Sequence, residues 1–498
     1  DSLMSGPLLV RLRELMEACP RTGIIQTSPR LARGKTLFQR IMQFSTQLCG
    51  PMFSAGSNFW QQGSGAYWGH NAIIRLRPFM QQCAIPELPA NSPLGRRILS
   101  HDSIEAALMQ KAGYDVWFAY DLEGGYEECP PSLPEALARD RRWCFGNLQH
   151  LYFLFVRQIR TESRFHLLNG IMAYAGSLIW LVFLLVSTIM AIGDHDTRST
   201  GGIPFEGKGA LLLAYVMTLL FLPKILGLAL VLEQQGAGDW GGRFKMMLSV
   251  LGEMTCSVLL APILMLFHAR FVVAALLGAK VSWGTQQRSA NRSSWLGALV
   301  MFGPVMLIVL AWAGLVLWLK PAFLTWLSLV LIGPLLSIPL SLLLGSSRWG
   351  WWARQKGWFV VPQESAPDAE LRQMEAPIVT QATYIRSRKF AADYGLMRVI
   401  LDPYVNAIHI SMLRQQPVRS RRTRSYIDGL TRKILVEGPS AMDDREKRHL
   451  IWDAEAIAEL HHRLWSSPAS ELAEWWQDAL RHYNDVSAFS IRKTIVNA

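Results

Sequence analysis

The sequence predicts an α/β domain joined to an α-helical membrane domain, followed by a mixed or helical C-terminal segment. The chain has 498 residues, of which 50% are hydrophobic and only 18% are charged, and its mean hydropathy is +0.17. Soluble globular chains average about a quarter charged residues, so this composition argues against an ordinary soluble enzyme. The 19 Trp, 21 Phe and 12 Tyr residues provide apolar surface to bury, which argues against intrinsic disorder.

Residues 1–143 alternate short apolar runs with helical patterns. The runs at 23–27 and 115–120 are typical of strands, and helices are expected over about 36–49 and 103–113. Because strands alternate with helices, we expect residues 1–143 to form an α/β domain.

Residues 167–347 form the predicted membrane domain. A helix needs roughly 20 apolar residues to cross a bilayer. Four segments are long and apolar enough, at 167–193, 209–232, 293–319 and 321–347. The second contains Pro223, which we expect to kink the helix, and Lys224, whose side chain we expect to extend to the cytoplasmic surface.

Two further segments are predicted to lie along the membrane surface. Residues 144–166 precede the first span and are expected to form an interfacial helix. Residues 246–279 contain Glu253, His268 and Arg270, which divide the segment into apolar pieces too short to span. This pattern favours a pair of interfacial amphipathic helices, and it gives four crossings, with six left open.

The distribution of charge predicts the orientation. Arg157, Arg160 and Arg164 precede the first span, whereas the loop at 194–208 holds three acidic residues, Asp194, Asp196 and Glu206, against two basic ones, Arg198 and Lys208. By the positive-inside rule the N-terminal part is cytoplasmic, and with four crossings the basic segment 348–498 is cytoplasmic as well. The net charge of +12 is better explained by anionic membrane lipids than by nucleic acid, because no nucleic-acid-binding motif accompanies the arginines.

The first residues of the sequence give an expectation about how the chain begins. The opening Asp-Ser-Leu-Met-Ser-Gly has neither the basic start nor the apolar run of a signal peptide. Since the first residue is Asp1 rather than Met, we expect a chain truncated at its N-terminus.

The six Cys residues have neither paired nor metal-ligand spacing, so we expect neither a disulfide framework nor a zinc site.

Four short motifs in the α/β segment carry chemically active side chains. They are Gly63–Arg75, Ser100–Asp102, Tyr126–Pro130 and Arg139–Trp143. Each has a structural explanation when taken singly, for example a turn at Gly63 or an N-cap at Asp102. Their order, with a carboxylate at a helix start and Arg-Arg-Trp just before the apolar helices, resembles the processive, membrane-integrated family 2 glycosyltransferases. The resemblance implies a glycosyltransferase-A-like domain, of which residues 1–143 are the C-terminal part.

This family includes the cellulose, chitin and hyaluronan synthases, and its acceptor base lies in a Thr-Glu-Asp-like triplet. Ser100-His101-Asp102 occupies that place, and only the aspartate is retained. An acceptor hydroxyl must lose its proton as it attacks the anomeric carbon, and a positioned carboxylate can accept that proton as a general base. The resemblance therefore assigns the base to Asp102.

The family's Gln-x-x-Arg-Trp motif is matched by Arg139-Asp140-Arg141-Arg142-Trp143, in which Arg139 replaces the glutamine. The resemblance implies substrate binding by Arg139, Arg141, Arg142 and Trp143. Arg142 can neutralise a departing diphosphate, and the Trp143 indole can stack on the sugar at the acceptor site. The particular hydrogen bonds of the glutamine are not preserved.

Further matches extend the predicted site. Asp1 resembles the end of the family's Asp-x-Asp motif, which implies that it holds a divalent cation, Mg²⁺ or Mn²⁺, against the diphosphate. The Gly-rich segment matches positions beside the acceptor, which implies substrate contacts there, and its residues are Gly65, Tyr67, Trp68 and His70.

A last match follows the 246–279 segment. Trp283-Gly284-Thr285-Gln286-Gln287-Arg288 resembles the family's cytoplasmic gating loop, so Trp283, Thr285 and Arg288 are candidates for contacts with uracil and diphosphate. A Trp at a membrane boundary is also often only an interface anchor, and this alternative stays open.

Nearly the whole chain is similar to the osmoregulated periplasmic glucan synthases of Gram-negative bacteria. The similarity includes Gln82–Pro89 in the N-terminal segment and Asp402–Ala407 near the C-terminus. It implies an inverting inner-membrane enzyme that uses UDP-glucose to build a β-1,2-linked glucan and passes the growing chain outward. It also implies acyl carrier protein as a partner.

Two alternatives remain open at this point, one from another class of function and one within the enzyme class. A non-catalytic transporter would suit several spans, proline-broken helices and the intramembrane Lys224. Another processive synthase, of the cellulose, chitin or hyaluronan type, would share the same motifs. A nucleic-acid-binding membrane protein is remote, because it would require binding that weakens steeply with salt.

Overall fold

The computed structural model describes residues 2–61, 63–193, 208–234, 236–279, 295–372, 390, 392–413 and 420–483. The chain divides into two compact units, Asp1–Asp368 and Ala369–Ala498. The first unit contains the α/β domain and the long apolar helices, and the second is helical in its described part.

Two three-stranded sheets form the centre of the α/β domain. In one sheet, β2 (Thr22–Thr27) pairs with β4 (Ala72–Ile74) in antiparallel and with β5 (Asp115–Ala119) in parallel orientation. In the other, β6 (Gly125–Glu127) lies between β1 (Ser2–Met4) and β3 (Arg30–Leu31). All six residues of β2 are buried, as expected of a central strand. The predicted strands at 23–27 and 115–120 and the α/β domain are therefore confirmed.

Five helices surround these sheets in the first part of the chain: α1 (Gly6–Ala18), α2 (Leu37–Gln61), α3 (Leu76–Gln82), α4 (Asp102–Lys111) and α5 (Leu133–Gln149). The hydroxyl of Ser5 caps α1, and Leu8, Leu12 and Met16 bury one face of it. The predicted helix over 36–49 is present, but α2 continues through Pro51 to Gln61.

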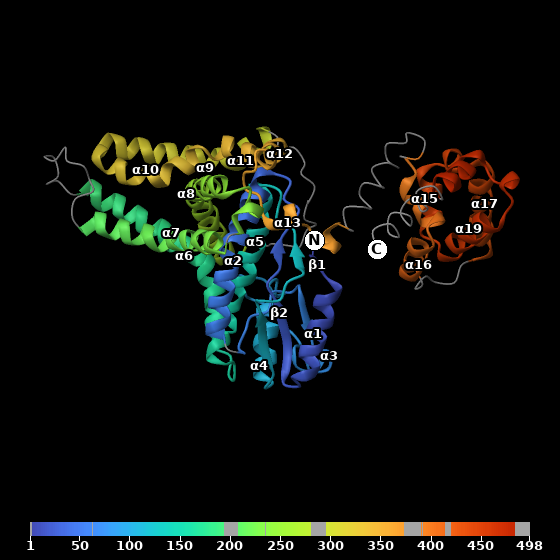
Figure 1. Cartoon of the computed structure of the whole chain (residues 1–498), viewed down its shortest axis with the longest axis horizontal. Helices are drawn as coiled ribbons and strands as arrows, with labels where there is room; N and C mark the ends of the chain where they lie inside the picture. Colours follow the sequence, from blue (N-terminus) through green and yellow to red (C-terminus); the bar gives the residue numbers. More distant parts are fainter. Residues whose placement is uncertain are drawn as a thin grey trace. The chain divides into compact units, whose positions relative to one another are not determined.

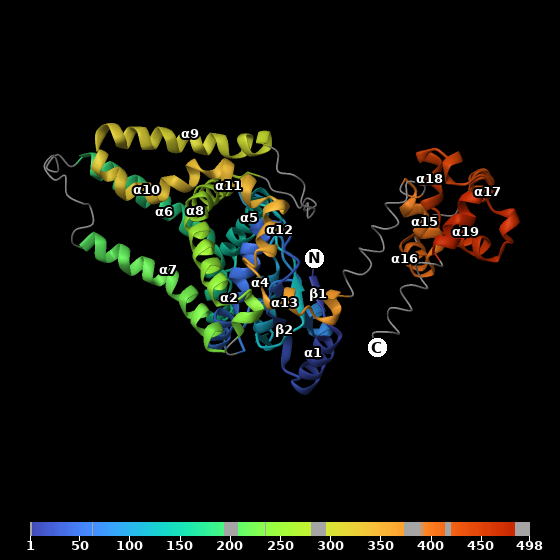
Figure 2. The ribbon, with the colours of Figure 1, turned by 45° about the horizontal axis from the view of Figure 1, so that its top comes forward.

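The long apolar helices form where they were predicted. They are α6 (Thr161–Gly193), α7 (Lys208–Glu233), α9 (Trp295–Leu319) and the pair α10 (Pro321–Leu335) and α11 (Ser337–Leu344), which is bent by 50°. Figures 1 and 2 show α6, α7, α9 and α10 extending to the same side, away from the sheets. By length and composition, four described helices could cross a membrane, namely α6, α7, α9 and the helix Arg243–Leu276, or five if the bent pair counts as one span, which fits a membrane protein.

The interfacial helix predicted over 144–166 is wrong. Helix α5 continues to Gln149, because Cys144, Phe145 and Leu148 pack into the core of this unit. A 3-10 turn at His150–Tyr152 and a short irregular segment follow, and α6 already begins at Thr161.

The pair of helices predicted over 246–279 is instead one continuous helix, α8 (Arg243–Leu276). Two of the residues expected to interrupt it have partners on other helices: the buried Glu253 contacts Lys224 of α7, and His268 contacts Asp140 of α5. Figure 2 shows α8 running across the ends of the other apolar helices, between them and the α/β domain.

The expectation that Lys224 extends to the surface is also wrong. Its Nζ lies 2.7 and 2.6 Å from the two carboxylate oxygens of Glu253 and 2.9 Å from Ser257 Oγ. Ser45 of α2 donates to the same Glu253 carboxylate at 2.9 Å. An opposite charge on the neighbouring helix therefore removes the need for the ammonium group to reach water.

The first unit ends with α12 (Ser347–Gln355) and α13 (Pro362–Ser365), which return to the α/β domain. The buried Arg40 of α2 donates to both carboxylate oxygens of Glu364, at 2.6 and 2.8 Å, and to the carbonyl of Phe359 at 2.9 Å. This bidentate pair fastens the end of the first unit to α2.

The second unit is helical in its described part. It contains α15 (Tyr394–Leu401), α16 (Pro403–Leu413), α17 (Arg421–Glu437), α18 (Asp444–Ile451) and α19 (Ala454–Ser466). These helices share a core of their own that includes Ile400, Ile434, Leu460 and Trp476. A capping box between Asp443 and Glu446 starts α18. The predicted mixed or helical segment is thus helical where it is described.

Candidate active site

A cleft of about 700 Å³ brings most of the predicted site residues together. The loop before β4, the start of α4, the end of β6 and the middle of α5 form its walls. The predicted residues in its lining are Tyr67, Trp68, His70, Asp102, Arg139, Arg142 and Trp143. Residues up to 76 positions apart in sequence, from Tyr67 to Trp143, therefore share one cavity.

Asp102 is the first residue of α4 rather than its N-cap. The N-cap is His101, and its side chain makes no capping hydrogen bond. The Asp102 side chain is 25% exposed, and burial is the main cause that raises the pKa of its carboxyl group above the ordinary value. His101 and His70 lower this pKa, and Glu105 raises it. A raised pKa suits a carboxylate that must accept a proton.

The backbone of Gly69 packs directly against the Asp102 carboxylate. Gly69 has a φ of +86°, which glycine adopts readily, and a Cβ atom there would lie only 2.5 Å from Asp102 Oδ1. The position therefore requires glycine for both its conformation and its contact.

Gln26, in the buried strand β2, holds this loop in place. Its Nε2 donates to the carbonyl oxygens of Thr27 and His70, both at 2.9 Å, and its Oε1 accepts from the backbone N–H of Trp68 at 2.9 Å. The Trp68 ring packs edge-on against Phe118 of β5 at 5.1 Å. The loop is thus fixed by a buried amide, which positions Gly69 over α4.

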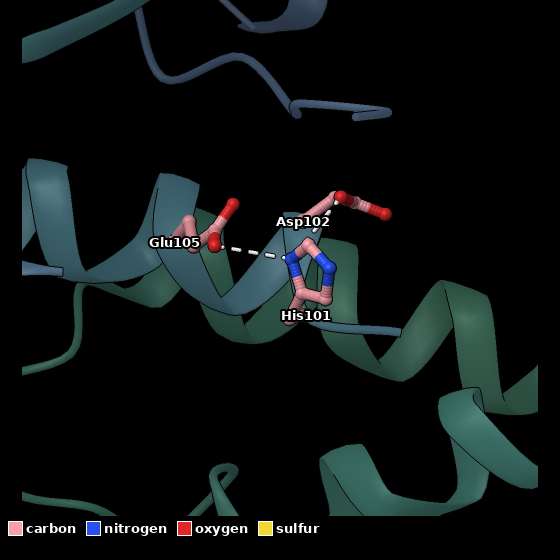
Figure 3. A group of neighbouring side chains, drawn as sticks. All are labelled: His101, Asp102 and Glu105. Atoms are coloured by element: carbon pink, nitrogen blue, oxygen red, sulfur yellow. Dashed lines mark ion pairs between the residues drawn. The ribbon is translucent and has the colours of Figure 1, made fainter. Parts of the chain in front are cut away.

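Three polar side chains at the start of α4 form a compact group (Figure 3). His101 Nδ1 lies 3.3 Å from Asp102 Oδ1 and 3.0 Å from Glu105 Oε1. The hydrogen bond with Glu105 is the main cause that raises the pKa of His101. Donor atoms of these three residues lie within 4.8 Å of one another, which is close enough to share a metal ion.

The cleft is also lined by Glu127 and Glu128, to which the sequence assigned no individual role. His70 Nε2 pairs with Glu127 Oε2, and this hydrogen bond is the main cause that raises the pKa of His70. Glu128 pairs with Arg33 at 2.7 Å. The sequence singled out Tyr126–Pro130 as chemically active, and the two adjacent glutamates were the signal that could have identified these partners.

Helix α5 supplies the basic and aromatic side of the cleft. The guanidinium carbon of Arg139 lies 4.3 Å from the centre of the Trp143 ring, in a cation–π contact. Burial lowers the pKa of Arg142, which lines the cleft as well. Two guanidinium groups and an indole therefore line the same cavity as Asp102.

Several predicted site residues lie elsewhere. Arg141 is exposed and does not line the cleft, because its position on α5 is turned away from it. Gly65 also lies outside the lining: its N–H donates to Val116 O of β5 at 2.7 Å, and a Cβ there would lie 2.8 Å from the same oxygen. Gly65 thus permits a close approach of two backbones. Asp1, Trp283, Thr285 and Arg288 lie outside the described residues.

The sequence matches a known family and a set of curated proteins. Residues 1–231 match the model of the family described as glycosyl transferase family group 2. Proteins named glucans biosynthesis glucosyltransferase H match almost the whole chain. That of Pseudomonas savastanoi pv. phaseolicola is 40% identical over 487 residues, or 95% of this chain, and that of Pseudomonas syringae pv. syringae is 39% identical over the same length. The protein of Pseudomonas fluorescens Pf-5 is 39% identical over 491 residues.

The chain spans about half the length of the curated relatives it matches, since the alignments cover 56% of each of these three proteins.

Proposed function

We propose, from the match of residues 1–231 to glycosyl transferase family group 2, that the protein transfers glucose from UDP-glucose onto a growing β-1,2-linked glucan. The curated relatives that match the chain bear the name of a glucosyltransferase of glucan biosynthesis. The donor, the linkage and the export of the product are parts of the proposal.

The observation that carries the proposal is the single cleft that holds Asp102 together with Arg139, Arg142 and Trp143. Glucosyl transfer needs a base for the acceptor hydroxyl and positive charge for the leaving diphosphate. The cleft provides the carboxylate from α4 and the guanidinium groups from α5. These side chains thus meet both requirements within one cavity.

In the proposed reaction, an acceptor hydroxyl oxygen attacks the anomeric carbon of the donor, and the bond from that carbon to the diphosphate oxygen breaks. Asp102 takes the hydroxyl proton, and UDP departs with the electron pair of the broken bond. A single displacement of this kind inverts the anomeric configuration. Burial of Asp102 raises its pKa and thereby strengthens the carboxylate as a base.

The α5 side chains of the cleft would act through charge and stacking. Arg142 would hold the diphosphate with charge-assisted hydrogen bonds, which are stronger than neutral ones. Trp143, with Arg139 lying over its ring, would form a platform for the acceptor sugar. His70, paired with Glu127, would provide a polar group beside the Asp102 carboxylate.

We propose that a divalent cation, Mg²⁺ or Mn²⁺, is held by Asp1, which directly precedes the cleft residue Ser2 in the chain. The group of His101, Asp102 and Glu105 fits this role less well, because Mg²⁺ prefers oxygen ligands and a bound cation would occupy the proposed base. A cation at Asp1 would neutralise charge on the diphosphate.

We place the protein in the bacterial inner membrane, with the cleft and the C-terminal unit facing the cytoplasm. The support is the set of long apolar helices together with arginines 157, 160 and 164 just before and within the start of α6. Acyl carrier protein is proposed as a partner because an acidic protein suits a chain of net charge +12.

Product analysis tests this function. Inverted membrane vesicles that contain the protein in its full-length form would receive labelled UDP-glucose, Mg²⁺ and acyl carrier protein. We expect a glucan in which methylation analysis finds 2-linked glucose. A 4-linked product, or use of UDP-N-acetylglucosamine instead, would assign the protein to another processive synthase. No incorporation from any UDP-sugar would favour a transporter.

A further inference from the structure

The aspartate within the Arg139–Trp143 motif makes a contact that the proposed reaction does not use. Asp140 Oδ2 lies 3.0 Å from Nε2 of His268, which belongs to α8 and is 128 residues away in sequence. The two side chains are only 16% and 12% exposed. The pair therefore joins helix α5 of the cleft to the long helix that crosses the apolar bundle.

The second oxygen of the same carboxylate faces the cleft residues. Asp140 Oδ1 lies 3.6 Å from Arg139 Nε, and the Arg139 guanidinium in turn lies 4.3 Å from the centre of the Trp143 ring. One carboxylate thus has His268 on one side and Arg139 on the other. Each contact in this series constrains the next, from His268 of α8 through Asp140 and Arg139 to the Trp143 indole in the cleft.

Packing against aromatic rings fixes the orientation of the His268 imidazole. The ring of Tyr174 from α6 lies 5.1 Å from the His268 ring at an angle of 66°, and Phe271, one turn further along α8, lies 6.2 Å away. Tyr174 is buried in the core that α5, α6 and α8 share. A rigid donor therefore presents its Nε2 to Asp140.

We propose that Asp140 and His268 are positioning residues that set Arg139 and Trp143 for the acceptor sugar. This inference rests on the proposed function for its kinetic consequence, although the geometry it describes does not depend on which sugar is transferred. Arg142 lines the cleft from the next turn of α5 and would bind the diphosphate, so donor binding should depend less on the pair than acceptor binding does.

The kinetic test compares Asp140→Asn, His268→Gln and the double variant in membrane vesicles. Since misplacing a reacting group by about 1 Å can cost about a hundredfold in rate, we expect each single variant to lose roughly tenfold to a hundredfold in kcat/KM for the acceptor. KM for UDP-glucose should change less than about twofold. Because both residues act through one contact, the double variant should lose no more kcat/KM than the more impaired single variant.

A second readout is independent of sugar transfer. In protein labelled with 5-fluorotryptophan, the ¹⁹F resonance of Trp143 is identified by its loss in Trp143→Phe. We expect Asp140→Asn and His268→Gln to move this resonance, and Asp140→Glu, which keeps the charge, to move it less. Arg270→Gln changes an exposed residue of α8 and is the matched control, with no expected effect on the resonance or on kinetics.

The two readouts separate the two proposals. A moved resonance without any glucose transfer by the wild type would support the positioning pair and overturn the proposed function. An unmoved resonance in both variants would overturn the positioning pair even if glucose is transferred. Multiplied losses in the double variant would also overturn it, because they would show that Asp140 and His268 act independently.

Discussion

A methyl group added to Gly69 would place its carbon 2.5 Å from Oδ1 of Asp102. The substitution Gly69→Ala should therefore displace the proposed base and reduce kcat by at least about tenfold, since catalytic geometry tolerates little misplacement. The φ of +86° adds backbone strain of about 1 kcal/mol. Sugar transfer and thermal unfolding of the purified variant would be measured together.

Gly95→Ala is the matched control for this prediction. Gly95 has a similar φ of +79°, but a Cβ there would meet no atom within 4 Å. Both variants should lose similar stability, and only Gly69→Ala should lose activity. Equal activity losses in the two variants would mean that strain, rather than contact with Asp102, is responsible.

The pH dependence of the reaction should report the environment of Asp102. Only the ionised carboxylate can accept a proton, so kcat/KM should fall as the pH falls through the raised pKa of Asp102. The positive charge of His101 lowers this pKa. Replacing it in His101→Asn should raise the pKa, and the acidic limb of the pH profile should move to higher pH.

His462→Asn serves as the control for the pH experiment, because His462 is an exposed residue of α19 in the second unit. Its profile should match that of the wild type. If His101→Asn leaves the acidic limb in place or moves it to lower pH, the limb does not belong to Asp102.

The buried pair of Lys224 and Glu253 should matter for stability rather than for chemistry. Their side chains are 17% and 6% exposed, so removing one partner leaves a buried charge unpaired. Lys224→Met and Glu253→Leu should each destabilise the protein by about 3–5 kcal/mol, whereas the double variant that carries both substitutions should recover most of this loss. Thermal unfolding in detergent would measure the loss of stability. A loss in the double variant equal to the sum of the two single losses would contradict the pairing.

The cysteines should differ sharply in reactivity. Cys19 is partly exposed, whereas the other five are buried. Burial raises the pKa of Cys83 to about 11 and those of Cys129 and Cys144 to about 12, so almost no thiolate forms at neutral pH. A maleimide reagent at pH 7 should label one site quickly in the native protein, and none in Cys19→Ser. Rapid labelling of several sites would contradict the burial pattern.

Local patterns were sufficient to predict much of the fold. The strands at 23–27 and 115–120 and the long apolar helices follow from short runs of residue types, which need no knowledge of distant contacts. Helix α8 was predicted incorrectly because its charged residues seemed to interrupt an apolar segment. Their partners, Lys224 and Asp140, lie 29 and 128 residues away, and no local pattern reveals such pairs.

The candidate site shows the same difference between features set by local motifs and features set by distant contacts. Asp102, Arg142 and Trp143 could be identified because they belong to short motifs with a known family resemblance, and the cleft brings them together. The roles of Gln26 and Glu127 depend on contacts with His70, which is 44 and 57 residues away from them. Such contacts arise only when β2, the loop before β4 and β6 assemble.

The most direct test of the account compares the wild type with Asp102→Asn in glucose incorporation from labelled UDP-glucose. A general base contributes about a hundredfold or more, so the variant should lose at least that much activity. It should be equally abundant and bind UDP as tightly as the wild type. A variant that is as active as the wild type would show that Asp102 is only the first residue of α4, and the proposed mechanism would be wrong.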